Sequence, residues 1–199
     1  MHTIFKQDTP VLSFFHIPKT GTTSITSALN SYFTMQDATA QLKHVCKVGH
    51  ANIPNLTDKE YLANNRVCVL RHPYDRAMSL WHHCTRYHEV NDTINHFFLR
   101  LSSRYPQGMG NSEHEPESAS VDFFAPQWHW AQHCNIYLNF NNLNVDFNNV
   151  LNRYVMPGIY NLPRKNVTNN KNLPVLKRHH KKLIQKIYAD DFEHLDFIP

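Results

Sequence analysis

The segment that most constrains the fold joins a short apolar run to a polar loop and then to an amphipathic stretch. Val11–Phe15 is apolar enough for a buried strand, and Thr22–Tyr32 has the residue pattern of a helix. The connection contains Lys19 and Gly21 and leads into three successive hydroxyl residues. Gly21 permits a tight turn, and the first N–H groups of a helix lack partners within it. Because the helix dipole and a lysine both favour negative charge, the segment predicts an anion-binding loop.

This loop differs from the Walker A loop of nucleoside triphosphatases. The Walker pattern is Gly-x4-Gly-Lys-Ser/Thr, whereas Lys19 here precedes the only glycine of the turn. The order of residues therefore disfavours a triphosphatase, although the strand–loop–helix arrangement is shared. An ordinary turn with a threonine N-cap would explain the hydroxyl groups, but it would not explain the lysine beside them.

A second strand–helix junction follows about fifty residues later. Arg66–Leu70 is another short apolar run, and the residues after it have helical periodicity. Arg71 stands at the end of this strand, and Ser79 lies two turns into the helix. An arginine can bind a phosphate through two N–H groups, and a serine adds a hydroxyl, so the pattern predicts a second anion site. The alternative is that Arg71 or Arg76 forms a surface ion pair with Asp75.

The whole chain has the length and composition of one α/β domain. Its 199 residues, 41% of them hydrophobic, suffice for one well-buried core and are few for two. Strands that alternate with helices predict an open, P-loop-like parallel sheet flanked by helices. Further elements are expected at helix 57–63, helix 93–101, a helix opening at Pro126, strand 135–140, a helix over Asp146–Tyr154 capped by Asp146, and helix 174–188. Residues 105–121 are rich in Pro, Gly and Ser, which predicts a flexible loop that is either a substrate lid or an insertion without a role.

Charge and residue usage exclude several classes of protein. The net charge of +4 suits anionic ligands but is too small for the basic stripe of a nucleic-acid-binding protein. No stretch approaches the roughly 18 apolar residues that span a bilayer, and no signal-peptide pattern opens the chain, so we expect a cytoplasmic protein. The four cysteines lack C-x-x-C spacing and are expected to be reduced thiols. His129 and His133 would share a helix face, but without a third ligand they predict no metal site.

Together the two motifs resemble those of sulfotransferases that use 3′-phosphoadenosine 5′-phosphosulfate (PAPS). The run from His16 to Gly21, His-Ile-Pro-Lys-Thr-Gly, is similar to the 5′-phosphosulfate loop of the carbohydrate sulfotransferases. Arg71 and Ser79 match the Arg-x7-Ser element by which that family binds the 3′-phosphate. Weaker resemblances cover Ala125-Pro126-Gln127, the strand region Tyr137–Leu143 with Asn141 in place of a glutamate, Lys165-Asn166-Val167-Thr168, and Ile187–Phe192.

The resemblance implies a single sulfotransferase-like domain over residues 1–199 and a set of cofactor-binding residues. PAPS would be the co-substrate and 3′-phosphoadenosine 5′-phosphate (PAP) the product, with no metal required. In an in-line transfer, Lys19 would stabilise the leaving phosphate. The residues implied to bind the nucleotide are Lys19, Thr20, Gly21, Thr22, Thr23, Ser24, Arg71, Ser79 and Asn166.

The acceptor hydroxyl needs a general base, and histidine is the favoured type near neutral pH. Val48-Gly49-His50 resembles the base-bearing segment of the uronyl 2-O-sulfotransferases, which implies His50 as the base, with His44 second and Asp37 a weaker candidate. The expected function is transfer of a sulfuryl group to a hydroxyl of a carbohydrate. A small alcohol, a lipid sugar or a tyrosine stays open as the acceptor. Two other functions stay open: a P-loop nucleotide kinase that needs ATP and magnesium, and a non-catalytic nucleotide- or glycan-binding module on the same fold.

Overall fold

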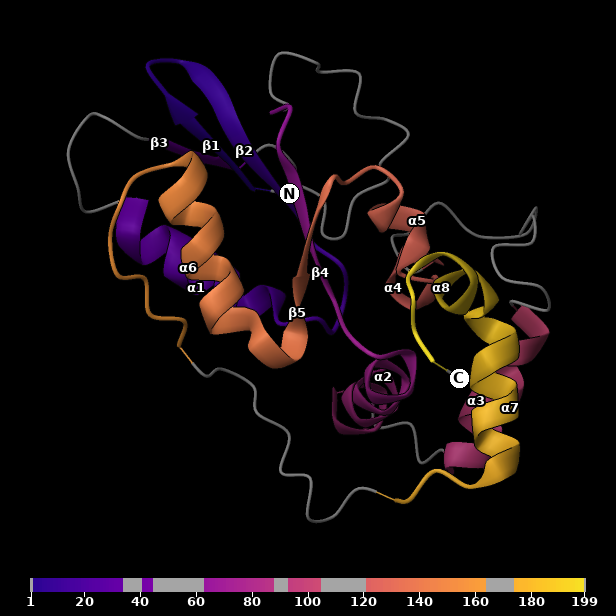
Figure 1. Ribbon diagram of the computed structural model, residues 1–199. Helices are drawn as coiled ribbons and strands as arrows, with labels where there is room; N and C mark the ends of the chain where they lie inside the picture. Colours follow the sequence, from indigo (N-terminus) through magenta and orange to yellow (C-terminus); the bar gives the residue numbers. More distant parts are fainter. Residues whose placement is uncertain are drawn as a thin grey trace. The chain divides into compact units, whose positions relative to one another are not determined.

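The computed structural model describes residues 2–33, 41–44, 63–87, 93–104, 121–163 and 174–198. Within it the chain forms two compact units (Figure 1). Each unit has its own hydrophobic core. The first unit combines residues 1–70 with 130–166, and the second combines residues 71–129 with 167–199. The α/β class is confirmed, and the expectation of a single domain stays a prediction.

The first unit is built on a five-stranded sheet in the order β3-β1-β2-β4-β5. The strands are β1 (His2–Lys6), β2 (Thr9–Phe15), β3 (Gln41–His44), β4 (Arg66–Leu70) and β5 (Ile136–Asn139). Strands β2, β4 and β5 run parallel, as expected, whereas β1 is antiparallel to both β2 and β3. Because β2, β4 and β5 are parallel, their carboxyl ends meet at one edge of the sheet, where ligands bind in open α/β folds.

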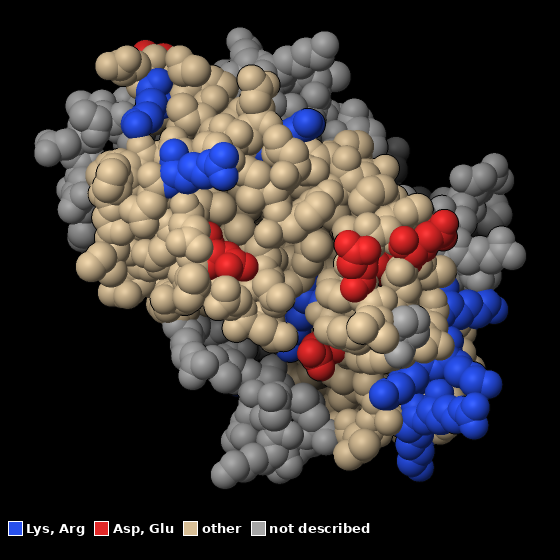
Figure 2. Space-filling view, in the orientation of Figure 1, with Lys and Arg blue, Asp and Glu red and all other residues tan. Residues whose placement is uncertain are grey.

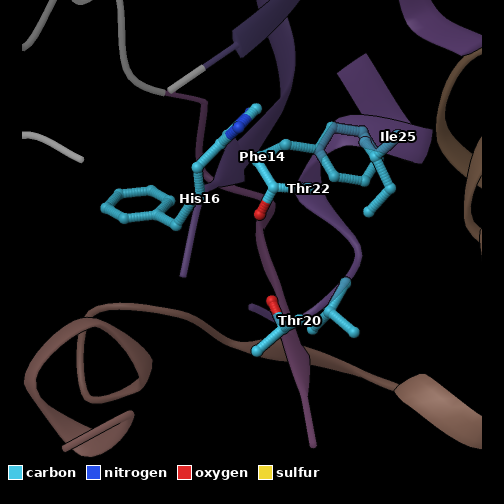
Figure 3. Close-up of a pocket in the computed structure, with 7 residues that line it drawn as sticks. Phe14, His16, Thr20, Thr22 and Ile25 are labelled. Carbon is cyan, nitrogen blue, oxygen red and sulfur yellow. The ribbon is translucent and has the colours of Figure 1, made fainter. Parts of the chain in front are cut away.

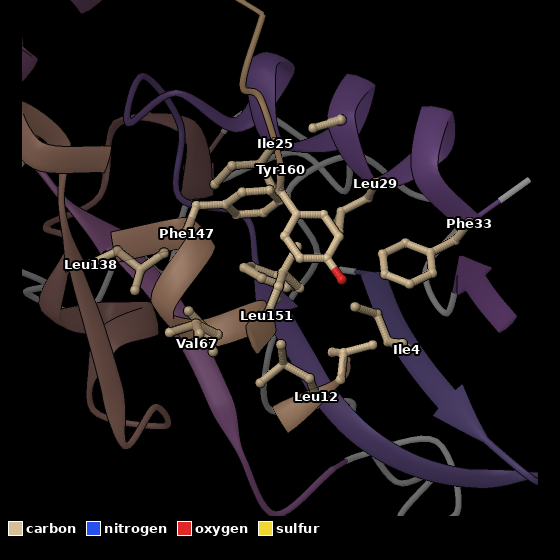
Figure 4. Packing of buried hydrophobic residues seen from close by; sticks show 14 of the residues in the cluster. Ile4, Leu12, Ile25, Leu29, Phe33, Val67, Leu138, Phe147, Leu151 and Tyr160 are labelled. Carbon is tan, nitrogen blue, oxygen red and sulfur yellow. The ribbon is translucent and has the colours of Figure 1, made fainter. Parts of the chain in front are cut away.

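Helices α1 (Thr22–Phe33) and α6 (Leu143–Tyr154) cover one face of this sheet (Figure 1). Alternate strand residues point toward them, because successive side chains of a strand face opposite sides. Ile25 and Leu29 of α1 and Phe147 and Leu151 of α6 complete this core, which Figure 4 shows in close-up. Each such side chain, once buried, contributes about 1.5–3 kcal/mol, so the core fixes both helices against the sheet. The strand residues in the core include Ile4, Leu12, Phe14, Val67, Val69 and Leu138.

The second unit is helical. It contains α2 (Pro73–Tyr87), α3 (Ile94–Arg104), α4 (Val121–Phe124), α7 (Arg178–Ile187) and α8 (Ala189–His194), while α5 (Trp128–Ala131) lies where the chain passes between the units. Its core includes Leu80, Phe98, Ile184 and Tyr188, each fully buried. Among the described residues no helix is long and apolar enough to cross a membrane.

Most predicted elements are confirmed, but the predicted cap of one helix and the predicted bounds of another are wrong. Strand 66–70 and the helix opening at Pro73 match β4 and α2. Asp146 does not cap its helix, because α6 begins earlier, at Leu143; Asp146 instead accepts a hydrogen bond from the backbone N–H of Asn139, at 2.8 Å. The predicted helix 174–188 starts only at Arg178 and ends at Ile187, and Tyr188 separates it from α8.

Two further predictions concern a loop and the cysteines. The expected helix 57–63 lies almost entirely outside the described residues, as do residues 105–120 of the expected loop, and Val121 already begins α4. Cys68, Cys84 and Cys134 are free thiols, as expected, and burial raises the pKa of Cys68. Cys46 lies outside the described residues.

Candidate functional site

The loop between β2 and α1 turns on two residues with left-handed backbone conformations. Lys19 has φ = 68° and Gly21 has φ = 92°. The carbonyl of Gly21 then accepts the first helical hydrogen bonds, from the N–H groups of Ser24 (3.0 Å) and Ile25 (3.2 Å). The helix therefore starts directly after the turn, and its first N–H groups and positive dipole end lie at this loop.

Two threonine side chains hold the loop in shape. The Oγ1 atoms of Thr20 and Thr22 both donate to the carbonyl of Ile17, each at 2.9 Å. The two hydroxyl groups are consequently turned toward each other, as Figure 3 shows. Because each hydroxyl has one proton, neither has a second to offer an anion. Thr20 and Thr22 thus act through their hydroxyls on the shape of the loop.

Gly21 is required by its surroundings as well as by its conformation. A Cβ atom built there would lie 2.9 Å from Cδ2 of Leu143 and 3.4 Å from Cε2 of Phe140. The loop is therefore packed directly on the residues that connect β5 to α6. Lys19 lacks the conformational freedom of glycine, so its left-handed conformation costs roughly 1–2 kcal/mol, as for any residue with a Cβ. Strain of this kind gathers at functional sites, which fits a lysine placed for its charge.

A small hollow, partly open to solvent, adjoins the loop (Figure 3). His16 lines it, and Nε2 of His16 lies 2.7 Å from Nδ1 of His2 on the neighbouring strand. The two imidazoles form a hydrogen-bonded pair whose ring centroids are 4.6 Å apart. The residues that line the hollow are Phe14, Phe15, His16, Thr20, Thr22, Ile25 and Val69.

The second motif lies at the start of α2 in the helical unit. Arg71 is the first residue after β4, and its guanidinium is partly buried. Burial lowers the pKa of Arg71, attraction to Asp75 opposes this effect, and repulsion from Arg76 adds to it. Ser79, two turns further along, is only 8% exposed. Arg71 and the N-terminal end of the helix dipole both favour negative charge here, which suits a phosphate.

Arg76 is not the surface cation that the alternative interpretation made it. Its side chain is fully buried: the guanidinium lies 5.3 Å from the ring centroid of Tyr188, and Nη2 donates to the carbonyl of Phe123 at 3.5 Å. Asp75 is exposed, so a surface pair between these two residues is wrong. Arg76 belongs to the internal structure of the helical unit. The other half of the alternative, a pair between Arg71 and Asp75, stays open, because Asp75 attracts the guanidinium of Arg71.

The structure describes only some of the predicted site residues. It places Lys19 to Ser24 at the end of the β2–α1 loop and in the first turn of α1, Arg71 just before α2, and Ser79 two turns further along. His50, Asp37 and Asn166 lie outside the described residues. His44 ends β3, where its backbone pairs with His2.

The histidine pair considered for a metal does not share a helix. Helix α5 ends at Ala131, so His133 lies beyond it and the i, i+4 spacing from His129 has no structural meaning. Burial lowers the pKa of His133, with repulsion from Arg66 adding to the effect. Among the residues that the structure describes, no group of three His, Cys, Asp or Glu side chains is arranged to hold a metal ion.

Sequence reasoning missed the part that Gln127 and Asp191 play around Arg71. Both side chains are fully buried, and Gln127 forms hydrogen bonds with the backbone of Arg71. Their positions in sequence, 56 and 120 residues after Arg71, carry no spacing signal. The only hint was that both belong to the weaker resemblances, the Pro-Gln element and the Tyr-x-x-Asp-Phe ending.

Comparison with known families agrees with these two motifs. The sequence model of the family described as "Sulfotransferase family" matches residues 2–197, nearly the whole chain. No curated protein and no solved structure was found to match.

Proposed function

The chain belongs to the sulfotransferase family, and on this premise we propose that it transfers a sulfuryl group from PAPS to a hydroxyl group of a carbohydrate. The observation that carries the proposal is the conformation of the β2–α1 loop. Lys19 is held in a left-handed conformation next to the N-terminus of α1. Hydrogen bonds from the hydroxyls of Thr20 and Thr22 to the carbonyl of Ile17 hold the loop in shape. Such a loop supplies a fixed positive charge and backbone N–H groups for a phosphate.

The residues proposed to hold the nucleotide divide into two groups. The N–H groups from Gly21 to Thr23, with the hydroxyls of Thr23 and Ser24, would hold the 5′-phosphosulfate. Arg71 and Ser79 would bind the 3′-phosphate, through a guanidinium fork and a hydroxyl. The joint resemblance of both motifs to those of the family supports a single nucleotide bound by the two of them. Asn166 completes the proposed set from its sequence resemblance.

In the proposed reaction, bound PAPS supplies an activated sulfuryl group. The acceptor oxygen forms a bond to sulfur as the bond from sulfur to the 5′-phosphate oxygen breaks, and the acceptor proton passes to a base. Negative charge develops on the bridging oxygen, where Lys19 stabilises it. Charge stabilisation and positioning are the main demands of such a loose transition state, and a lysine with backbone N–H groups meets them without a metal.

His50 is proposed as the base, with His44 as the second candidate, on the sequence resemblance alone. An imidazole has a pKa near neutrality, so it can accept the acceptor proton and release it again. A His50→Ala variant that still binds PAP but no longer turns over would separate an enzyme from a non-catalytic binding module. Unchanged turnover in that variant would remove His50 from the mechanism.

A basic surface on α7 favours a carbohydrate acceptor that carries negative charges. Figure 2 shows Lys and Arg side chains gathered over this helix. Its opposite side, with Ile184 and Ile187, is buried in the core of the helical unit. A face of one charge raises the local concentration of an oppositely charged substrate, so it favours a glycan with acidic groups. The exposed cations of this face are Lys177, Arg178, Lys181, Lys182 and Lys186.

The direct test is sulfuryl transfer from radiolabelled PAPS to a panel of neutral and acidic glycans. Lys19→Ala should lower the transfer rate by about 10²–10³-fold, the usual loss when one charge-stabilising group is removed. Lys6→Ala is the matched control, because Lys6 is an exposed lysine at the end of β1. Equal rates for the two variants, or no transfer by the wild-type protein to any acceptor in the panel, would overturn the proposed function.

A further inference from the structure

The side chain of Gln127 forms two hydrogen bonds with the backbone of Arg71. The N–H of Arg71 donates to Oε1 of Gln127 at 2.9 Å, and Nε2 of Gln127 donates to the carbonyl of Arg71 at 2.8 Å. Gln127 is fully buried. Two hydrogen bonds of opposite direction to one residue fix both peptide planes next to its Cα atom. They therefore limit the directions in which the side chain of Arg71 can leave the backbone.

The carboxylate of Asp191 determines which way the amide of Gln127 points. Oδ2 of Asp191 accepts from Nε2 of Gln127 at 3.2 Å, and Oδ1 accepts from the backbone N–H of Trp128 at 2.8 Å. An ionised carboxylate can only accept hydrogen bonds, so it holds the NH₂ side of the amide toward itself. Turning the amide over would place its oxygen against the carboxylate and its NH₂ against the N–H of Arg71. Only the observed orientation satisfies all the groups.

A carboxylate in this position is not explained by stability alone. Asp191 has no exposed surface, and burial raises its pKa to about 6, although Arg76 and the two hydrogen-bond donors pull the pKa the other way. Attraction to the buried cation of Arg76 gives this charge one structural use. The hydrogen bond to Gln127 gives it a second, because Gln127 in turn holds the backbone of Arg71.

We propose that Gln127 and Asp191 are positioning residues, which hold the backbone of Arg71 so that its guanidinium is preset for the 3′-phosphate of the nucleotide. This inference rests on the proposed function. It gives a physical role to two sequence elements that the mechanism does not use, the Pro-Gln pair before α5 and the Asp-Phe pair in α8. We call Gln127 and Asp191 together the clamp. Because the clamp acts on Arg71, it should raise the affinity for a 3′-phosphate and leave the binding of the 5′-phosphate unchanged.

The test compares the affinities for PAP and for AMP, which lacks the 3′-phosphate, by calorimetric titration of the full chain. Asp191→Asn keeps the shape of the side chain but places an NH₂ group where a carboxylate oxygen stood. One of the hydrogen bonds to Gln127 or Trp128 is then lost, and the amide of Gln127 is no longer held. Glu193→Gln is the matched control, since it makes the same change at an exposed position of the same helix.

We expect Asp191→Asn to lower the affinity for PAP about tenfold, the effect of weakening one charge-assisted contact, and to change the affinity for AMP less than twofold. Gln127→Met, which keeps the length of the side chain without its amide, should do the same and serves if the Asn variant does not fold. Glu193→Gln should change neither affinity. In a protein that already carries Arg71→Ala, adding Asp191→Asn or Gln127→Met should not lower the affinity for PAP any further. The reason is that substitutions that act through the same contact are not additive.

Three outcomes would overturn the inference. The first is a PAP-to-AMP preference that survives both clamp substitutions. The second is a loss of PAP affinity that persists in the Arg71→Ala background, because the clamp would then act through another group. The third is a wild-type protein without any preference for PAP over AMP, which would remove the proposed function as well. The first two leave the proposed function intact, so the two failures are distinguishable.

Discussion

Replacing Gly21 by alanine should destabilise the protein through two separate effects. The backbone of Gly21 has φ = 92°, a conformation that costs a residue with a Cβ roughly 1–2 kcal/mol. The new Cβ would also meet Cδ2 of Leu143 at 2.9 Å, and moving that side chain off its rotamer costs about 0.5–1.5 kcal/mol. The lower entropy of the unfolded alanine chain returns about 0.4–1 kcal/mol. The free energy of unfolding should therefore fall by roughly 1–3 kcal/mol.

Thermal unfolding followed by circular dichroism measures this loss. For a chain of this size, 1 kcal/mol corresponds to about 2–4 °C, so the midpoint should fall by about 2–12 °C. Gly158→Ala is the matched control, because its φ is not in the left-handed region and its Cβ would lie 3.3 Å from the ring of Tyr160. Leu143→Ala removes the atom that the new Cβ would meet. Gly21→Ala should therefore lower the unfolding midpoint less in a Leu143→Ala protein than in the wild-type protein. An unfolding midpoint for Gly21→Ala equal to that of Gly158→Ala would refute the described loop geometry.

Three further predictions concern the loop and the buried carboxylate. Lys19→Gly should raise the free energy of unfolding by about 1 kcal/mol, because glycine adopts the left-handed conformation without strain, and should slow sulfuryl transfer as Lys19→Ala does. A destabilised Lys19→Gly variant would contradict the strain. Thr22→Val should lower stability by about 1 kcal/mol through the lost hydrogen bond to Ile17, which chemical denaturation can measure against Thr9→Val at an exposed position of β2. Asp191 has a folded pKa of about 6 against an ordinary 3.8, so the folded state holds the extra proton between these values. The free energy of unfolding should therefore fall by up to ~3 kcal/mol as pH rises through that interval, which a denaturation series from pH 4 to 7 can measure. The same fall in an Asp191→Asn variant would show that Asp191 is not the group responsible.

The elements that could be predicted from sequence are those whose signals are local. Strand β4 is a continuous apolar run, and Pro73 marks the first turn of α2, so both were placed correctly. Strand β1 was missed because its turn to β2, at Gln7 and Asp8, adopts positive φ values of 46° and 61° without a glycine. The break between α7 and α8 was missed for a similar reason, since Tyr188 ends the helix without a glycine or proline.

The candidate site divides in the same way. Lys19 to Ser24 were found together because they form one contiguous segment of six residues in the sequence. The role of the Thr20 and Thr22 hydroxyls was not predictable, because it depends on where the carbonyl of Ile17 points in the folded loop. The contact between Gln127 and Asp191 joins positions 64 residues apart. Such a contact is decided by tertiary packing, and periodicity along the chain does not reveal it.

The most direct test of the proposed activity is calorimetric titration of the wild-type protein with PAP, AMP and ATP–magnesium. If Lys19 and Arg71 bind the two phosphate groups of one nucleotide, PAP should bind more tightly than AMP by a factor of about ten or more. ATP–magnesium should bind weakly, because the loop lacks the Walker A pattern. Equal binding of PAP and AMP would contradict a sulfotransferase site, and a preference for ATP–magnesium would identify a nucleotide kinase in its place.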